Sequence, residues 1–299
     1  MTSILITGGT GLIGKHLCNV LRSKGYNILI LSRNKTNNPN TYYWNISENY
    51  IDPKAIQTAD YVIHLAGSGI ADKRWTKKIK KELIDSRVKS ANLLFSKIKT
   101  LNPNLKAFIS ASGIGYYGTI TSEKIFKETD ASGNDFLATV CKVWEEASNQ
   151  FNSLNIRTVI LRTGVVFSKK GGAFEKMSQP IKLGFGSPIG TGNQYIPWIH
   201  IDDLCNMYVD AIENNELNGI YNAVAPDYVT NEFLTKSIAT ILHKKAWLPN
   251  VPSFMLKLIF GEMAVILLEG SRVSAEKIKS TGFKFKYPFL LEALKDLNT

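Results

Sequence analysis

Cysteine is scarce in this sequence. The 299 residues contain three cysteines, Cys18, Cys141 and Cys205, which stand in unrelated contexts without a CxxC pair. A disulfide framework or a zinc site needs a patterned set of such residues. The four histidines likewise show no ligand spacing with one another or with carboxylates. We therefore expect no disulfide framework, no metal, and a reducing, cytoplasmic location.

Long uninterrupted hydrophobic runs are also missing. Met1 leads directly into a strand pattern, SILIT, without the basic segment and apolar stretch of a secretory signal. The most apolar region, 251–268, is interrupted by Lys257 and Glu262, which makes it too polar for a membrane span. We interpret it as a buried core helix, with a homodimer contact as the alternative, and we expect no membrane association.

Acidic residues are outnumbered. Twenty-five Asp and Glu against 36 Lys and Arg leave a net charge of +11, which favours anionic ligands. The lysines are dispersed along the chain and lack the interleaved arginines and aromatic residues of a nucleic-acid platform. We expect a small-molecule substrate and no nucleic acid.

Short apolar runs alternate with helical patterns along the first half of the chain. The strand-like runs are 4–7, 27–32, 61–66, 107–111 and 157–162, and the helical patterns are 13–24, 77–99 and 136–154. Strands that are apolar throughout are covered on both faces, and parallel neighbours need helical crossovers. The pattern predicts an α/β fold with a Rossmann, doubly wound parallel sheet.

After residue 168 the pattern changes to loops rich in Gly and Pro, followed by mostly helical sequence. We predict a nucleotide-binding Rossmann domain over 1–168, to which 198–225 returns. A smaller, interwoven C-terminal lobe, formed by 169–197 and 226–299, would contact the substrate. In such folds the ligand lies in the crevice at the carboxyl ends of the strands.

A glycine-rich loop follows the first strand. In TGGTGLIG (7–14), Gly8, Gly11 and Gly14 have GxxGxxG spacing, and a helical pattern begins at once. Glycine lets the turn form and lets the backbone approach a pyrophosphate, which the free N–H groups of the following helix favour. The loop predicts dinucleotide binding.

The second strand ends in Ser32 and Arg33, where an NAD-binding protein carries an Asp or Glu for the ribose hydroxyls. A cation in place of that acid favours the 2′-phosphate of NADP. We predict NADP as the cofactor, with Ser32 and Arg33 at the phosphate. The alternative for Arg33 is a solvated loop charge.

Further motifs carry a family resemblance. With ADYVIHLAG (59–67), FISASGIGYYG (108–118), LRTGVVFS (161–168) and WIHIDDL (198–204), the sequence resembles the extended short-chain dehydrogenases/reductases of the NAD-dependent epimerase/dehydratase superfamily. The RWT, GGAF, LGFGSPIGTG, NAVAP and LLEGSRV segments are similar to those of its atypical, sugar nucleotide epimerase-like branch. The resemblance spans nearly the whole chain.

The resemblance also implies cofactor contacts. It places Gly8, Gly11, Leu12, Ile13 and Gly14 at the pyrophosphate, with Thr10 as a further contact from the same loop; Leu65, Ala66 and Gly67 at the adenine-side ribose; and Thr163, Gly164 and Val166 at the nicotinamide end. Glu82 and Arg87 would approach the cofactor from the long helix, with surface charges as the alternative.

The superfamily's catalytic Tyr-xxx-Lys pair is missing. When Glu145 is matched to the acidic residue that follows the Lys, the Tyr position is Leu137 and the Lys position is Cys141, and neither side chain supplies that proton transfer. The Arg that nucleotide-sugar enzymes carry before IHxxD is Ile196, which argues against a UDP-sugar substrate.

The remaining catalytic candidates are Ser112, Tyr116 and Tyr117, with either tyrosine as proton donor and simple packing of the crevice wall as the alternative. Asp135 is either an N-cap or a catalytic carboxylate. Two functions stay open. One is an NADP(H)-dependent oxidoreductase of the epimerase family acting on a small polar metabolite. The other is a catalytically silent NADP(H)-binding sensor or regulatory protein.

Overall fold

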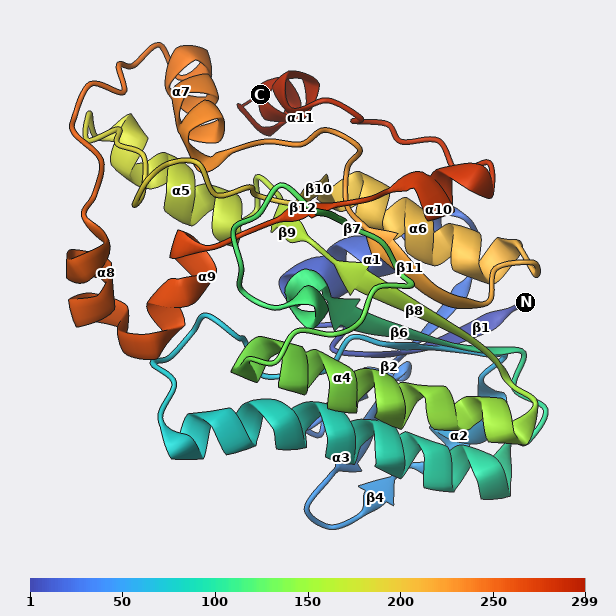
Figure 1. Ribbon diagram of the computed structural model, residues 1–299. Coiled ribbons are helices and arrows are strands. Elements are labelled where there is room, and N and C mark those ends of the chain that lie inside the picture. Colours follow the sequence, from blue (N-terminus) through green and yellow to red (C-terminus); the bar gives the residue numbers. More distant parts are fainter. Residues whose placement is uncertain (299) are drawn as a thin grey trace.

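The computed structural model describes residues 1–298, whose main sheet has eight strands in the order β11-β8-β6-β5-β1-β2-β3-β4 (Figure 1). The strands are β1 (Ser3–Thr7), β2 (Asn27–Ser32), β3 (Thr41–Asn45), β4 (Tyr50–Ile51), β5 (Tyr61–His64), β6 (Ala107–Gly113), β8 (Arg157–Thr163) and β11 (Gly219–Ala223). Neighbours run parallel except β3 and β4. The predicted doubly wound α/β sheet is confirmed.

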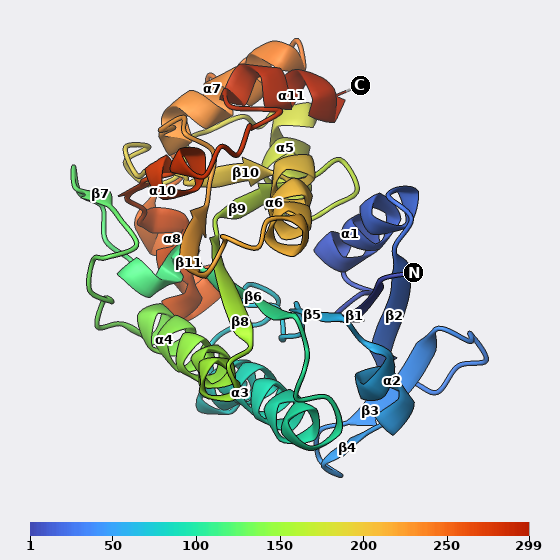
Figure 2. The ribbon, with the colours of Figure 1, turned by 90° about the vertical axis from the view of Figure 1, so that its right-hand side faces the viewer.

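Helices cover both faces of this sheet (Figures 1 and 2). One face carries α1 (Leu12–Ser23), α6 (Ile201–Glu213) and α10 (Glu276–Ser280); the other carries α2 (Pro53–Thr58), α3 (Lys77–Leu101), α4 (Phe136–Asn149) and η2 (Gln150–Leu154). Along β1, Ile4 and Ile6 pack into the first layer and Leu5 into the second. This double burial is why the strand is apolar at successive positions.

The rest of the chain forms a lobe beyond the carboxyl edge of the sheet. Besides the segment 251–268, which is described below, its elements are η1 (Ile114–Tyr117), β7 (Ile125–Phe126), β9 (Val165–Phe167), α5 (Ala173–Lys182), β10 (Trp198–His200), α7 (Asn231–Ile241), β12 (Arg272–Val273) and α11 (Leu290–Asn298). A separate core that includes Phe167, Phe174 and Trp198 joins β9, β10, α5, α7 and α11. The predicted domain boundaries stay a prediction.

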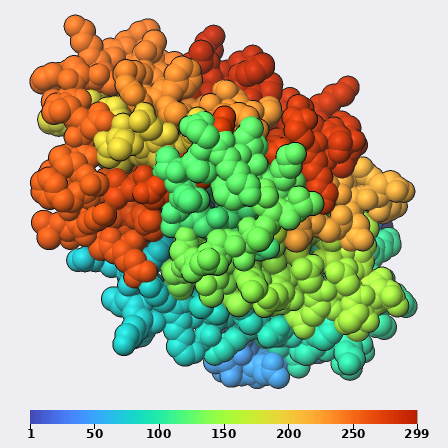
Figure 3. All heavy atoms as spheres, in the orientation of Figure 1, coloured from blue at the N-terminus to red at the C-terminus, as the bar shows by residue number. Residues whose placement is uncertain are grey.

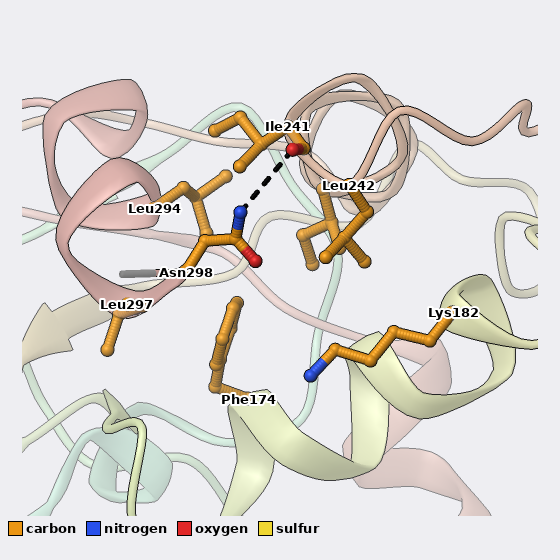
Figure 4. Close-up of a pocket in the computed structure, with 8 residues that line it drawn as sticks. Phe174, Lys182, Ile241, Leu242, Leu294, Leu297 and Asn298 are labelled. Atoms are coloured by element: carbon orange, nitrogen blue, oxygen red, sulfur yellow. Dashed lines mark hydrogen bonds between the residues drawn. The ribbon is translucent and has the colours of Figure 1, made fainter.

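A small gap remains in this second core, between α5, α7 and α11 (Figure 4). Phe174 and Leu294 are among its walls, and the Asn298 side chain donates to the Ile241 carbonyl at 3.5 Å beside it. Its volume of about 10 Å³ is at the lower limit of what a single water molecule needs. It is a packing defect rather than a substrate pocket.

The prediction of one buried helix over 251–268 is wrong. This segment forms α8 (Ser253–Phe260), η3 (Gly261–Ala264) and α9 (Val265–Leu268). The helix breaks at Gly261, whose φ of +61° favours glycine. Met263 and Ala264 reach the interior, but α8 leaves Phe254 and Leu258 exposed.

Candidate functional site

The glycine loop lies at the carboxyl end of β1, which pairs with β2 on one side and β5 on the other. Gly8 has a φ of +70°, and a Cβ there would lie 3.0 Å from the Leu65 carbonyl. A Cβ on Gly14 would lie 2.2 Å from the Gly8 oxygen, while the Gly11 N–H donates to that oxygen at 3.0 Å. The loop therefore closes tightly against the start of α1. These bare backbone positions fit a dinucleotide pyrophosphate.

Ser32 and Arg33 lie at the carboxyl end of the neighbouring strand β2. The Ser32 hydroxyl accepts from the Asn34 N–H at 3.0 Å and donates to the Asn34 carbonyl at 2.8 Å, which turns the chain at this point. Arg33 is exposed, and within residues 1–298 it forms no ion pair with a carboxylate. Its charge is available to an anionic ligand.

A buried hydrogen-bonded chain that the sequence reading missed fixes the facing β5–α3 loop. The Leu65 and Ala66 N–H groups both donate to the Thr7 hydroxyl at 3.1 Å. That hydroxyl contacts His64 Nδ1 at 2.8 Å, and His64 Nε2 contacts the Ser90 hydroxyl at 3.1 Å. Burial lowers the pKa of His64 to about 4. The neutral ring thus holds Leu65 and Ala66 beside the glycine loop.

Arg87 lies under the same loop, so its interpretation as a surface charge is wrong. Its guanidinium donates to the Leu83 and Ser68 carbonyls at 2.9 and 3.0 Å and lies over the Trp144 ring at 4.8 Å. A Cβ on Gly67 would lie 3.0 Å from the Arg87 Cζ.

Glu82 is exposed and accepts from the Ser68 hydroxyl at 3.0 Å. Glu82 and Arg87 of α3 therefore both contact the loop that follows β5. Whether they reach the cofactor stays a prediction.

The end of β6 meets a buried ionic network at the expected reaction centre. Arg162 donates to both carboxylate oxygens of Glu145 at 2.8 Å, and the Ser112 hydroxyl donates to Glu145 at 2.7 Å. Arg162 also donates to the Tyr117 hydroxyl at 3.0 Å, and that hydroxyl donates to Asn222 at 2.7 Å. The network joins β6, α4, β8 and β11 beneath η1.

Two of the three catalytic candidates, Ser112 and Tyr117, thus have hydrogen-bond partners inside the protein. The side chains of Ser112 and Tyr117 are buried, and burial raises the pKa of Tyr117 to about 12 despite the nearby Arg162. Tyr116 differs because, within residues 1–298, no hydrogen bond engages its hydroxyl. Its ring lies 3.4 Å from the Arg162 Cζ and nearly perpendicular to Tyr117. Tyr116 has the more available phenol.

Leu137 and Cys141 face the same turn from α4. A Cβ on Gly115 would lie 3.3 Å from the Leu137 Cβ, and Cβ atoms on Gly113 and Gly115 would each lie 3.6 Å from the Cys141 sulfur. Burial raises the pKa of Cys141 to about 12. The thiol therefore stays protonated near neutral pH and is a poor nucleophile.

Thr163, Gly164 and Val166 lie at the turn from β8 into β9. The Gly164 N–H donates to the Ala223 carbonyl at 3.0 Å, and a Cβ on Gly164 would lie 2.5 Å from the Pro197 oxygen.

The C-terminal lobe also contacts the glycine loop, which the sequence did not predict. A Cβ on Gly172 would lie 2.8 Å from Leu12 Cδ2, so the turn before α5 packs against the start of α1.

Asp135 and His200 have structural roles. Asp135 is the N-cap of α4, where it accepts from the Ala138 N–H at 2.9 Å. His200 caps α6 by accepting from the Asp202 N–H at 3.2 Å. Asp203 accepts from the Lys286 N–H at 2.6 Å, which fastens this junction to the C-terminal segment. The N-cap alternative holds for Asp135.

Across residues 1–298, no helix is long and apolar enough to span a bilayer. In the same part of the chain, no group of three or more His, Cys, Asp or Glu residues could hold a metal ion.

Comparison with known proteins agrees with this geometry. The NAD dependent epimerase/dehydratase family matches residues 4–223, and a domain of unknown function, DUF1731, matches residues 251–297. The chain is 38% identical to the epimerase family protein YfhF of Bacillus subtilis, covering 99% of this chain and 97% of that protein. It is 35% identical to a chloroplastic SDR39U1 homolog of Arabidopsis thaliana, covering 98% and 86%. The crystal structure of human SDR39U1 with NADPH superposes with a TM-score of 0.89 at 31% identity and covers 99% of both chains.

Proposed function

Because this chain belongs to the NAD dependent epimerase/dehydratase family, we propose that it binds NADP(H) and catalyses an oxidoreduction or epimerase-like reaction on a small polar metabolite. The observation that carries this proposal is the pairing of a closed glycine loop on β1 with an unpaired arginine, in place of an acid, at the end of β2. The human relative crystallised with NADPH supports the choice of cofactor.

The chain's own residues would divide the binding of the dinucleotide. Backbone N–H groups from Leu12 to Gly14 would meet the pyrophosphate, with Gly8 and Gly11 lining it, and Arg33 would meet the 2′-phosphate. Leu65 and Ala66, held by Thr7, would border the adenine-side ribose. The nicotinamide would supply hydride transfer when bound.

Proton transfer in this reaction is assigned to Tyr116. Its hydroxyl is not engaged by the buried network, and the Arg162 guanidinium lies against its ring at 3.4 Å. A phenol in this position can give a proton to a developing alkoxide or take one from an alcohol. Ser112 and Tyr117 would position η1 through Glu145, Arg162 and Asn222.

The cofactor assignment is tested by calorimetric titration of Arg33→Ala with NADPH and NADH. Each charge-assisted hydrogen bond to the phosphate contributes about 1.5 to 3 kcal/mol, so NADPH affinity should fall roughly 10- to 150-fold. NADH affinity should change little. Lys99→Ala, which removes an exposed cation at the far end of α3, is the matched control. Equal losses for both nucleotides would refute the assignment.

The catalytic assignment is tested by following NADPH absorbance with a panel of carbonyl compounds. Tyr116→Phe should abolish turnover and preserve NADPH affinity. Tyr117→Phe should retain measurable turnover but lower the free energy of unfolding, because it removes a buried hydrogen bond to Asn222. Full turnover in Tyr116→Phe would eliminate this residue as the proton donor.

A catalytically silent NADP(H) sensor is the second candidate, and the apolar pair Leu137 and Cys141 favours it. Tight NADPH binding with an inert nicotinamide across the whole panel would support the sensor over the enzyme.

A further inference from the structure

The turn between β9 and α5 reaches from the C-terminal lobe to the glycine loop. It comprises residues 168–172, with the sequence SKKGG. Figure 2 shows it, in yellow-green, extending from the lobe toward α1. A Cβ on Gly172 would lie 2.8 Å from Leu12 Cδ2, so this turn touches the first residue of α1. We call residues 168–172 the lysine turn.

The backbone of the lysine turn is fixed by its own residues. Ser168 is buried, and its hydroxyl accepts from the Lys170 N–H at 3.2 Å. Gly171 and Gly172 have φ values of +121° and +85°, which residues with a side chain rarely adopt. The turn therefore holds its lysines at defined backbone positions beside α1.

The two lysines of the turn have different partners. Lys169 pairs with Asp296 of α11 at 3.7 Å, and Asp296 also accepts from the Tyr287 hydroxyl at 2.8 Å. Lys170 is exposed, and within residues 1–298 it forms no ion pair with a carboxylate. Two residues of chain span at most about 7 Å, so Lys170 lies within that distance of Gly172. Its flexible four-carbon stem can bring the ammonium to a phosphate at the start of α1.

The charges next to the turn on the α1 side are positive or already paired. Helix α1 contains no acidic residue, and Lys15 is an exposed cation in its first turn. His16 contacts one oxygen of Asp202 at 2.8 Å, and Lys286 contacts the other at 2.8 Å. An anion at the start of α1 therefore meets no unpaired carboxylate from this side.

Glu175 is the one acid in the first turn of α5. It is exposed, and its Oε2 lies 3.3 Å from the position that a Cβ on Gly171 would take. No ion pair joins it to Lys170 within the described chain, 1–298. Its negative charge opposes a phosphate at the turn, so its removal should act in the opposite direction to removal of Lys170.

On the opposite side, protein chain covers the reaction centre. Segment 118–134 lies at the surface there, in green in Figure 3. The Gly133 N–H donates to the Tyr116 carbonyl at 2.9 Å, and Arg162 donates to the Glu128 carbonyl at 3.4 Å. A dinucleotide that starts at the glycine loop and ends near Tyr116 would therefore lie on the α1 side, where the lysine turn is.

We propose that Lys170 binds the pyrophosphate of the dinucleotide and so joins the C-terminal lobe to the cofactor. This inference rests on the proposed function, because it needs a dinucleotide at the glycine loop. A hydrogen bond from an ammonium to a phosphate is charge-assisted and therefore strong. The pyrophosphate is common to NADPH and NADH, whereas the 2′-phosphate is not. Lys170 thus strengthens the binding of both nucleotides, and Arg33 distinguishes between them.

Calorimetric titration of Lys170→Ala with NADPH and with NADH tests the proposal. Both Kd values should rise by a similar factor, roughly tenfold or more, and the rise should shrink at high salt. Glu175→Gln should lower both Kd values. Lys176→Ala, which removes an exposed cation one turn further along α5, is the matched control and should leave both unchanged. Lys170 is exposed, so its variant should fold normally, which circular dichroism can check.

The outcomes separate this inference from the proposed function. If Lys170→Ala changes neither Kd while Arg33→Ala still weakens NADPH binding, the inference is overturned and the proposed function stands. A loss confined to NADPH would assign Lys170 to the 2′-phosphate and overturn the inference as well. An equal loss in Lys176→Ala would reduce the effect to general surface charge. A wild type that binds neither nucleotide would refute both the proposed function and this inference.

Discussion

Loss of Arg162 alone is expected to destabilise this protein about as much as loss of Arg162 and Glu145 together. The two side chains are 1% and 5% exposed, and two hydrogen bonds of 2.8 Å join them. In Arg162→Met, Glu145 keeps the hydroxyl of Ser112 as a partner but loses the opposite charge. An ionised carboxylate would then remain buried without its cation.

The magnitude follows from this geometry. Removal of one member of a buried ion pair costs about 3 to 5 kcal/mol, because the remaining charge stays desolvated. That loss is a large part of a typical total stability of about 5 to 15 kcal/mol. Glu145→Gln should cost a similar amount, since it strands the guanidinium. In the double variant neither charge remains, so its cost should be close to that of one single variant, and the summed cost of the single variants should exceed it by about 3 to 5 kcal/mol.

Urea denaturation of the wild type, both single variants and the double variant measures this coupling. The slopes should stay equal, so that differences in midpoint report stability. Ser112→Ala is the matched control, because it removes a neutral donor from Glu145 and should cost about 1 kcal/mol. Additive single costs in the double variant would show that the pair is not coupled and would refute the reasoning.

Two further predictions concern the glycine loop and its neighbour His64. The pKa of His64 is about 4 in the folded protein and 6.5 ordinarily, so the unfolded chain binds the extra proton between these values, and stability should fall by about 3 kcal/mol as the pH drops from 7 to 4. Denaturation curves across this range should show a smaller pH dependence in His64→Gln; an unchanged dependence would assign it to other groups. Gly14→Ala would bring a Cβ to 2.2 Å from the Gly8 oxygen and should lower NADPH affinity at least roughly tenfold by calorimetry. Gly11→Ala, where that distance is 3.3 Å, should cost less, and equal losses would contradict the steric argument.

The sheet is predictable because its strands are buried on both faces and therefore read as apolar runs. The run over β1 illustrates this, since all five residues are buried. The sequence did not predict the edge strand β3. Trp44 is buried, but the other four residues of this strand are only partly buried, so the strand does not read as an apolar run. The exposed α8 was misjudged for the opposite reason. Its composition is apolar, but composition does not reveal how many neighbours a helix has.

The site is predictable where its residues are close in sequence and not where the fold brings them together. The glycine loop and Arg33 follow single strands, so a local pattern identifies them. The hydrogen bond between Tyr117 and Asn222 joins residues that are 105 apart in the sequence, so no local sequence pattern predicts it. Arg162 offered one usable signal, because an arginine within an otherwise buried strand requires a partner.

Among the predicted catalytic candidates, Tyr116 is the one whose hydroxyl forms no hydrogen bond within the described residues 1–298. Leu137 and Cys141, the positions predicted for the superfamily's Tyr and Lys, pack against Gly113 and Gly115. The positive charge at this centre is instead that of Arg162, whose guanidinium lies against the Tyr116 ring and is neutralised by Glu145. Ser112 and Tyr117 are already bound within the same network. The proposed proton transfer therefore depends on η1, and Tyr116→Phe, which removes that hydroxyl, tests it directly.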